Sequence, residues 1–222
     1  MKTILTPFQK AIFEEICQDK FITDNFVFGG GTALSEFYLQ HRLSEDLDFF
    51  TENEIPFEKI RRSMDKIAKK LKIKSVEYRE IQSAKVFFLK SGKEMVKTDF
   101  NFFPYYHFEK GKKYKNLKIQ SLADIATSKL DTILTRNQAR DFVDFYFLQK
   151  ERQFSLEFLL KKIKEKSRWQ VDPLFLASCF LKAESLHDYP KMIKDFSKKD
   201  MISYFINLAK NQKKNIFLGT PP

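Results

Sequence analysis

Two aspartates separated by one residue follow a glycine turn and a short helix. Asp46 and Asp48 flank Leu47 in a segment that predicts a strand, so both carboxylates project from the same face. Two like charges this close repel each other and are costly unless a cation binds between them. The spacing therefore indicates a site for Mg²⁺, together with the phosphates that such a cation accompanies.

The segment before these aspartates suits a phosphate. Residues 26–28 predict a buried apolar strand, the glycines Gly30 and Gly31 allow a tight turn, and residues 32–40 predict a helix. The unpaired N–H groups and the positive dipole end of such a helix would face an anion in front of it. The candidates for phosphate contact are Gly30, Gly31, Thr32 and Arg42. Arg42 has a second, equally good role, an ion pair with Asp46 that holds the loop.

A third carboxylate is needed if two metal ions are to serve the attacking hydroxyl and the triphosphate. Alternation in the strand predicted around Asp99 places Lys97 and Asn101 on the face of this aspartate and the apolar residues on the other. If that strand lay antiparallel beside the Asp46–Asp48 strand, Asp99 would reach the same site. The alternative is a solvent-facing aspartate on an edge strand, and the residues alone leave the two equal.

The composition restricts the class of protein. A chain of 222 residues can hold one domain of about 150 residues with a helical appendage. No apolar run has the length of a membrane span, so a cytoplasmic protein without membrane contact is expected. Cys17 and Cys179 stand in apolar helical contexts and are predicted to be reduced core residues. The net charge of +11 favours a polyanionic partner such as RNA.

Periodicity predicts an α+β fold, a mixed sheet flanked by helices with a C-terminal helical extension. Thr6 and Gln9 form a capping box around Pro7, which predicts a helix to about residue 20. The further elements are helices at 57–71, 121–136 and 139–150, strands at about 74–81, 84–90 and 94–103, a hairpin turn at 91–93, a lysine-rich loop at 109–118 and a helical, basic remainder. A core over residues 1–150 and an extension over residues 151–222 are expected.

Two blocks of sequence resemble a known family. The run GGTALSEFYLQHRLSEDLDFF at 30–50 and the block at 121–146 are similar to the AbiEii/AbiGii-like nucleotidyltransferase toxins, of the polymerase-beta-type superfamily. Glycine turn, helix, His-Arg-x-Ser and Asp-x-Asp occur there in the family's order, and the resemblance covers roughly residues 25 to 150. It implies a nucleotidyltransferase fold, an NTP substrate with Mg²⁺ or Mn²⁺, Asp99 as the third metal ligand with Asp46 and Asp48, and nucleotide contact by Ser44.

The second block contains a lysine on the apolar face of a predicted helix and an aspartate that is expected to point into the protein. Lys129 shares the apolar stripe of its helix with Ile125. Its ammonium either reaches water along apolar neighbours or points at a phosphate. Because the family carries a nucleotide-associated lysine here, the resemblance favours the phosphate. Asp141 shares a face with Phe145, so it is expected to point towards Lys129 or the nucleotide, whereas Asp144 could form a surface ion pair with Arg140. The resemblance thus implies catalytic roles for Asp46, Asp48, Asp99, Lys129 and Asp141.

The lysines of the loop at 109–118 interleave with nearby rings, a mixture that suits phosphate contact with base stacking. These rings are Tyr105, Tyr106, His107 and Tyr114. The candidate RNA-binding residues are Lys110, Lys112, Lys113 and Lys115, although such a run is also typical of a solvated face. The resemblance implies a toxin of a bacterial toxin–antitoxin or phage-defence system with a cognate antitoxin. We expect transfer of an NMP from NTP to a tRNA 3′ end. The alternatives are a protein hydroxyl as acceptor, or a catalytically inactive nucleotide- or RNA-binding module.

Overall fold

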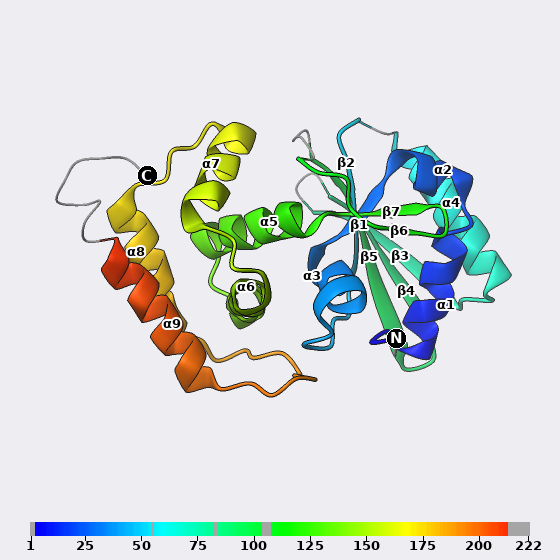
Figure 1. Ribbon diagram of the computed structural model, residues 1–222. Coiled ribbons are helices and arrows are strands. Elements are labelled where there is room, and N and C mark those ends of the chain that lie inside the picture. The colour runs from blue at the N-terminus through cyan, green and yellow to red at the C-terminus, as the bar shows by residue number, and fades with distance from the viewer. Residues whose placement is uncertain (1–2, 55, 82–83, 104–107, 213–222) are drawn as a thin grey trace. The chain divides into compact units, whose positions relative to one another are not determined.

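The chain divides into two compact units, residues 1–122 and 123–222, called the first and the second unit below. Figure 1 shows the computed structural model, which describes residues 3–54, 56–81, 84–103 and 108–212. None of the helices in these ranges is long and apolar enough to cross a lipid bilayer. The two units are described separately.

The first unit contains one mixed sheet, with the strand order β3-β4-β5-β2-β1-β7-β6. Its strands are β1 (Val27–Gly29), β2 (Leu47–Thr51), β3 (Ser75–Ile81), β4 (Ala84–Ser91), β5 (Glu94–Phe102), β6 (Lys113–Tyr114) and β7 (Leu117–Ile119). The pairs β1–β7 and β2–β5 are parallel, and the other neighbours are antiparallel. A mixed sheet with flanking helices confirms the predicted α+β class.

The three strands predicted after the aspartates all form, and the two-residue turn Gly92–Lys93 closes the predicted hairpin between β4 and β5. The expected direction of β5 was wrong, because β5 runs parallel to β2 rather than antiparallel. The crossover through helix α4 (Phe57–Lys70) gives β3 the direction of β2. Two antiparallel reversals then return β5 to that same direction.

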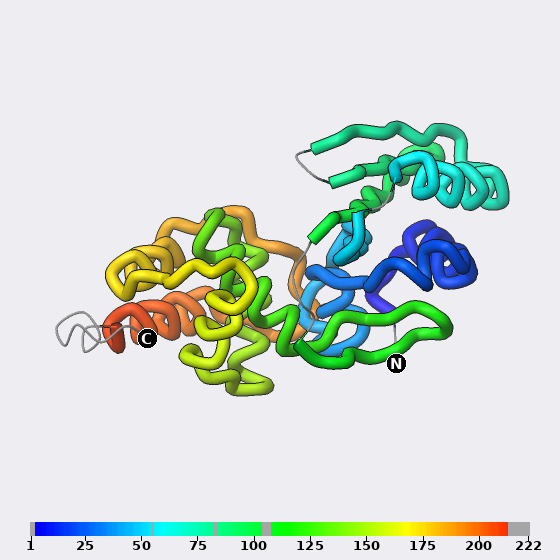
Figure 2. Tube along the Cα trace, turned by 90° about the horizontal axis from the view of Figure 1, so that it is seen from above, coloured from blue at the N-terminus to red at the C-terminus, as the bar shows by residue number. Residues whose placement is uncertain are grey.

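Helices cover one face of this sheet and bury an aromatic layer on it. The helices α1 (Pro7–Ile16), α2 (Lys20–Asn25) and α4 lie together there, and Figure 2 shows α1 and α4 side by side. The ring of Phe13 packs on Phe28, with centroids 4.8 Å apart, and Phe28 packs on Phe49 at 5.2 Å. Phe49 in turn stacks on Phe100 at 5.2 Å. Since side chains alternate along a strand, the residues next to Phe49 and Phe100 face the opposite side.

The N-terminal helix starts as predicted and ends earlier. Thr6 and Gln9 exchange both hydrogen bonds of the capping box, at 3.1 and 3.3 Å. The helix stops at Ile16 rather than near residue 20, because the carboxylate of Asp19 accepts from the N–H of Ile22 at 3.0 Å and caps the separate helix α2.

The helix predicted at 32–40 begins two residues earlier and changes its winding. The α-helical part, α3, spans Gly30–Leu34, and a π-helical turn, η1, follows over Ser35–Leu39. Gln40 ends it in the left-handed conformation, with its N–H donating to the carbonyl of Ser35 at 2.9 Å. Such wide turns are often found at functional sites, and nothing in the apolar periodicity distinguishes one from an α-helical turn.

The segment at 109–118, predicted to be a loop, contains the short antiparallel hairpin of β6 and β7. The prediction was wrong because Leu117 and Ile119 are buried and β7 pairs with β1, so two apolar positions suffice to attach the segment to the sheet.

The second unit is helical. Its helices are α5 (Leu122–Thr135), α6 (Ala139–Arg152), α7 (Leu156–Ser167), α8 (Pro173–Leu181), the 3₁₀ turn η2 (Lys182–Ser185) and α9 (Lys198–Asn211). The core predicted over residues 1–150 includes α5 and α6, whereas the compact units divide at residue 122. The rings of Phe142 and Phe205, with centroids 4.9 Å apart, show why α6 belongs with the C-terminal helix α9. Cys179 in α8 and Cys17 in the first unit are buried and reduced, as predicted.

Candidate active site

The sheet brings two of the predicted carboxylates side by side. Asp48 of β2 and Asp99 of β5 are direct partners in the parallel register, on the face opposite the aromatic layer. Asp46 immediately precedes β2, two residues from Asp48. The side chain of Asp46 is 29% exposed and that of Asp99 12%, so the group lies at a solvent-accessible border rather than in the core.

The predicted phosphate-contact residues hold the segment that carries Asp46. The hydroxyl of buried Thr32 donates to Ser44 Oγ at 2.8 Å and lies within hydrogen-bond reach of the Asp46 carbonyl. From α1, Gln9 Nε2 donates to the carbonyls of Ser44 and Glu45 at 3.1 and 3.0 Å. Two side chains from distant parts of the sequence, Thr32 and Gln9, thus fix the loop before the aspartate strand.

Both glycines of the turn lie against close neighbours. Gly30 has a φ of +69°, a conformation that L side chains rarely adopt, and a Cβ there would overlap the carboxylate of Asp48. A Cβ at Gly31 would overlap the guanidinium of Arg42. Arg42 is 3% exposed and its Nη1 donates to the Leu43 carbonyl at 2.8 Å, which fits a role in holding the loop. Its contact with phosphate stays a prediction.

Lys97 is a site residue whose importance the sequence analysis missed. Its ammonium donates to Asp99 Oδ2 and lies 3.8 Å from Asp46 Oδ2. Burial works against the charged form, but the hydrogen bond to Asp99 and the charges of Asp46, Asp99 and Asp48 outweigh it and raise the pKa of Lys97. The signal was present in the sequence, because a lysine two residues before Asp99 must share its face.

In this structure the carboxylates of Asp46 and Asp99 bind the ammonium of Lys97. In the part of the chain that the structure describes, no three His, Cys, Asp or Glu side chains are grouped closely enough to hold a metal ion. The donors nevertheless fit Mg²⁺, which prefers carboxylate oxygens from one or two aspartates and keeps several waters. The Asp48 carboxylate lies directly against Gly30, at a place that the Cβ of any other residue would overlap. Asp46, Asp48 and Asp99 are therefore the residues that would hold a divalent cation.

The second unit has a charge cluster of a different kind. Lys129 of α5 lies 3.0 Å from Asp141 Oδ1 and 2.7 Å from Asp144 Oδ2, and its side chain is only 8% exposed. Arg136 binds Asp141 with two hydrogen bonds, at 2.7 and 3.0 Å. Burial raises the pKa of Asp141, but the charges of Lys129 and Arg136 and the hydrogen bonds from them outweigh it and lower the pKa overall. The inward direction predicted for Asp141 is confirmed, whereas Asp144 is a buried partner of Lys129 rather than part of a surface pair.

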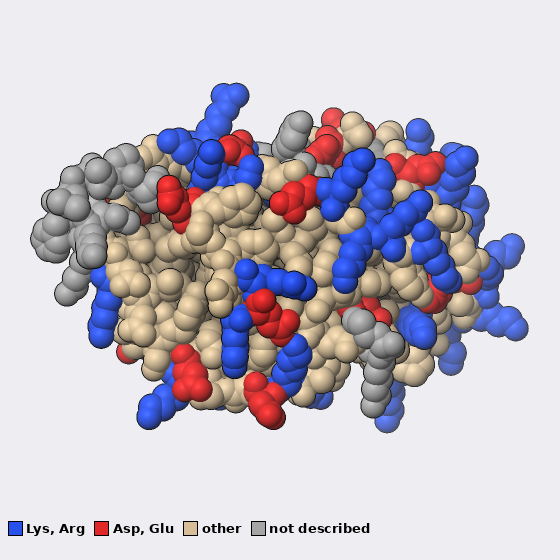
Figure 3. Space-filling model, viewed as in Figure 1, with Lys and Arg blue, Asp and Glu red and all other residues tan. Residues whose placement is uncertain are grey.

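Two of the four candidate RNA-binding lysines make contacts within the first unit. Lys112 donates to the carbonyl of Phe37 at 2.6 Å, and Lys115 forms an ion pair with Glu14. Lys110 and Lys113 are exposed, and Figure 3 shows Lys and Arg side chains spread densely over the first unit on the visible face. The aromatic residues Tyr105 and Tyr106 lie outside the described residues.

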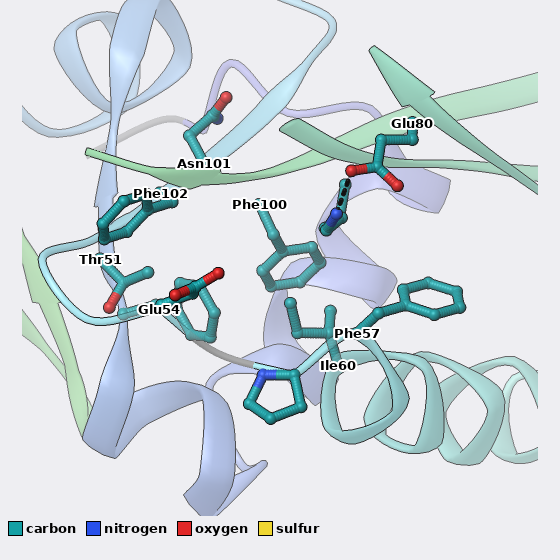
Figure 4. Close-up of a pocket in the computed structure, with 11 residues that line it drawn as sticks. Thr51, Glu54, Phe57, Ile60, Glu80, Phe100, Asn101 and Phe102 are labelled. Carbon is teal, nitrogen blue, oxygen red and sulfur yellow. Dashed lines mark hydrogen bonds and ion pairs between the residues drawn. The ribbon is translucent and has the colours of Figure 1, made fainter. Parts of the chain in front are cut away.

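A pocket of about 490 Å³ lies elsewhere in the first unit. Phe57 and Ile60 of α4 line it together with Phe100, as Figure 4 shows. Asn101 points to the other side of the strand from Phe100 in that view. None of the three aspartates lines the pocket, because they share the opposite face of the sheet.

The mixed sheet with its flanking helices is consistent with a nucleotidyltransferase-like α+β fold, and comparisons with known proteins identify the family. Residues 13–205 match the family described as "Nucleotidyl transferase AbiEii toxin, Type IV TA system". The chain belongs to this family of nucleotidyltransferase toxins, as the resemblance in the sequence implied. An NTP substrate and an antitoxin partner follow from membership at the level of the family.

Known proteins resemble the chain over most of its length. The uncharacterized protein aq_aa25 of Aquifex aeolicus (strain VF5) is 33% identical over 166 residues, which are 72% of each chain. The crystal structure of JHP933 from Helicobacter pylori covers 95% of this chain and 90% of its own, with a TM-score of 0.57 and 20% identity. A second H. pylori crystal structure has a TM-score of 0.59 and 20% identity, and covers 95% of this chain and 94% of its own. At this identity the two structures show a shared fold.

Proposed function

We propose that the protein transfers a nucleoside monophosphate from an NTP to the 3′ hydroxyl of an RNA, with tRNA as the expected acceptor. The observation that carries this proposal is the register of the sheet, which pairs Asp48 with Asp99. Asp48 follows Asp46 by two residues, and its carboxylate lies against Gly30. Mg²⁺, once bound by these carboxylates, would neutralise charge on the triphosphate and lower the pKa of the attacking hydroxyl.

The reaction itself needs positioning more than covalent chemistry from the protein. The acceptor oxygen forms a bond to the α-phosphorus, the bond from that phosphorus to the bridging oxygen breaks, and pyrophosphate leaves. The hydroxyl proton passes to a base, for which the carboxylate of Asp99 is the candidate. Gly30, Gly31, Thr32, Arg42 and Ser44 surround the proposed phosphate position, with Thr32 and Ser44 already joined by a hydrogen bond.

An acceptor with a negatively charged backbone agrees with the net charge of +11. Toxicity would follow from blocking the acceptor end of tRNA, and the family's antitoxin would counter it. Lys129 and Asp141 of the second unit are proposed nucleotide-binding and catalytic residues, as the family resemblance implies.

The test is incubation of the pure protein with each α-labelled NTP and Mg²⁺, with and without total tRNA. We expect label at an RNA 3′ hydroxyl for one preferred NTP, and none with Asp48→Asn. Label on protein side chains alone would replace the RNA acceptor by a protein hydroxyl. Absence of transfer to either acceptor, with NTP binding retained, would make the chain a binding module.

A further inference from the structure

Lys97 occupies the place in the carboxylate group where a cation is needed. Its position in β5, two residues before Asp99, directs it to the face of the three aspartates. The parallel register pairs Leu47 with Thr98. One residue towards the N-terminus on each strand, Lys97 therefore comes to lie beside Asp46. The ion pairs with Asp99 and Asp46 follow from this backbone arrangement.

The chemistry of lysine suits a replaceable counter-ion. An ammonium is a compact point charge on a flexible stem, without the fixed bidentate geometry of a guanidinium. The side chain of Lys97 is 29% exposed, so its head group can move towards solvent without leaving a fully buried site. By contrast, carboxylates that lose their counter-ion repel each other.

We propose that Lys97 is a positioning residue that holds Asp46 and Asp99 in the nucleotide-free protein and yields its place when a divalent cation binds. This inference rests on the proposed function, since it assigns the metal to the same carboxylates. It agrees with the register that pairs Asp48 with Asp99, and with the finding that no three acidic, His or Cys side chains of the described residues are grouped to hold a metal ion. The ammonium and the metal ion then compete for the same oxygens.

Because the ammonium and the metal ion compete, removal of Lys97 should change stability and metal affinity in opposite directions. Without the ammonium, the aspartates repel each other and the metal-free protein loses stability. The same repulsion and the vacated oxygens favour a divalent cation, so metal affinity rises. A lysine that only supported the strand would leave metal affinity unchanged or lower it.

The experiment is a titration of nucleotide-free protein with Mn²⁺, followed by electron paramagnetic resonance of the free ion. We expect Lys97→Met to bind Mn²⁺ roughly tenfold more tightly than the wild type. The reason is that the variant lacks the ammonium that competes with Mn²⁺ for the carboxylates of Asp46 and Asp99. Lys97→Gln, which keeps a polar side chain, tests the same effect if the Met variant folds poorly. Lys97→Arg keeps the charge and should retain an affinity close to that of the wild type.

The matched control is Lys90→Met, which removes another lysine of the same sheet, paired with Glu77 away from the aspartates. It should leave Mn²⁺ affinity unchanged. Equal affinity of Lys97→Met, Lys97→Gln and wild type would overturn the role of Lys97 while leaving the metal site intact. If neither the wild type nor these variants bind Mn²⁺, and Asp48→Asn behaves alike, the metal assignment itself fails and the inference with it.

Discussion

The two units each contain a cluster of aspartates with a lysine, and the clusters differ in exposure and in bonding. In the first unit, Lys97 is 29% exposed and contacts carboxylates that lie at the border of the sheet. In the second unit, Asp141 and Asp144 are fully buried and Lys129 is 8% exposed. The first arrangement allows exchange of its cation, whereas the second keeps its cations in place.

This difference separates a lysine that can exchange for another cation from a lysine that the fold itself needs, whether or not a nucleotide also contacts it. A buried charge must be paired, because an unpaired one costs several kcal/mol. Lys129, with Arg136, meets this need for two carboxylates within a single unit. The ion pairs of Lys129 stabilise the fold directly, whereas the carboxylates around Asp48 are the proposed ligands of a metal ion.

The largest effect is expected from the carboxylates of the first unit. Asp48→Asn should lower transfer by roughly a thousandfold, because charge that stabilises the transition state is lost. Its free energy of unfolding should change little, since a repelling charge is removed at an accessible border. Transfer of a labelled nucleotide measures the activity, and denaturant unfolding measures the free energy of unfolding. Asp65→Asn on α4, whose ion pair with Arg61 is exposed, is the control and should affect neither.

The second effect concerns the buried cluster. Lys129→Met should lower the free energy of unfolding by about 3–5 kcal/mol, because two buried carboxylates lose their shared partner. Denaturant unfolding followed by circular dichroism measures this loss. If stability stays unchanged while nucleotide affinity falls, Lys129 is chiefly a nucleotide ligand and the contrast between the two clusters is wrong.

The pH dependence of stability sharpens the same contrast. The pKa of Asp141 is lower in the folded protein than its ordinary value, so its ion pairs stabilise the fold above about pH 4. That contribution is lost as the pH falls through the lowered folded pKa. Asp141→Asn should therefore be less stable than the wild type at pH 7, and the two should converge towards pH 2. A constant difference across this range would contradict the assignment.

The smallest effect per residue is expected on the basic surface. Lys110, Lys113 and Lys118 are exposed. Lys112 is exposed as well, but its ammonium donates to the carbonyl of Phe37. Changing Lys110, Lys113 and Lys118 to Gln should flatten the salt dependence of RNA binding by roughly 0.7–0.9 of a unit each. NTP binding should not change. The matched control changes Lys59, Lys66 and Lys69 of α4, and an equal flattening there would show that binding follows net charge rather than this hairpin.

Most strands and most helices could be predicted because each has a plain local signal, whereas the short strands β6 and β7 could not. Alternation marks β5, and the capping box at Thr6 and the apolar stripe of α4 mark their helices. The direction of β5 could not be predicted, since it depends on the path of the whole crossover rather than on its residues. The π-helical turn at Ser35–Leu39 depends likewise on tertiary contacts, such as the hydrogen bond from Tyr38 to the Gln120 carbonyl at 2.7 Å.

The sequence also indicated most of the candidate site. Asp46, Asp48 and Asp99 were chosen by spacing and resemblance, and the register puts Asp48 and Asp99 side by side. Lys97 was named only as a neighbour on the same face, because its partners come from two strands whose pairing was not known. The division of the chain at residue 122 was hidden for a similar reason, since α5 follows β7 with almost no linker.

A crystal structure of the protein with Mn²⁺ and a non-hydrolysable NTP analogue would locate the metal and the triphosphate. We expect an anomalous Mn²⁺ peak between the carboxylates of Asp48 and Asp99, with the triphosphate beside the Gly30–Gly31 turn and the Lys97 ammonium displaced from Asp46 and Asp99. A peak at Asp141 and Asp144 instead, with Lys97 still paired to Asp99, would contradict this assignment.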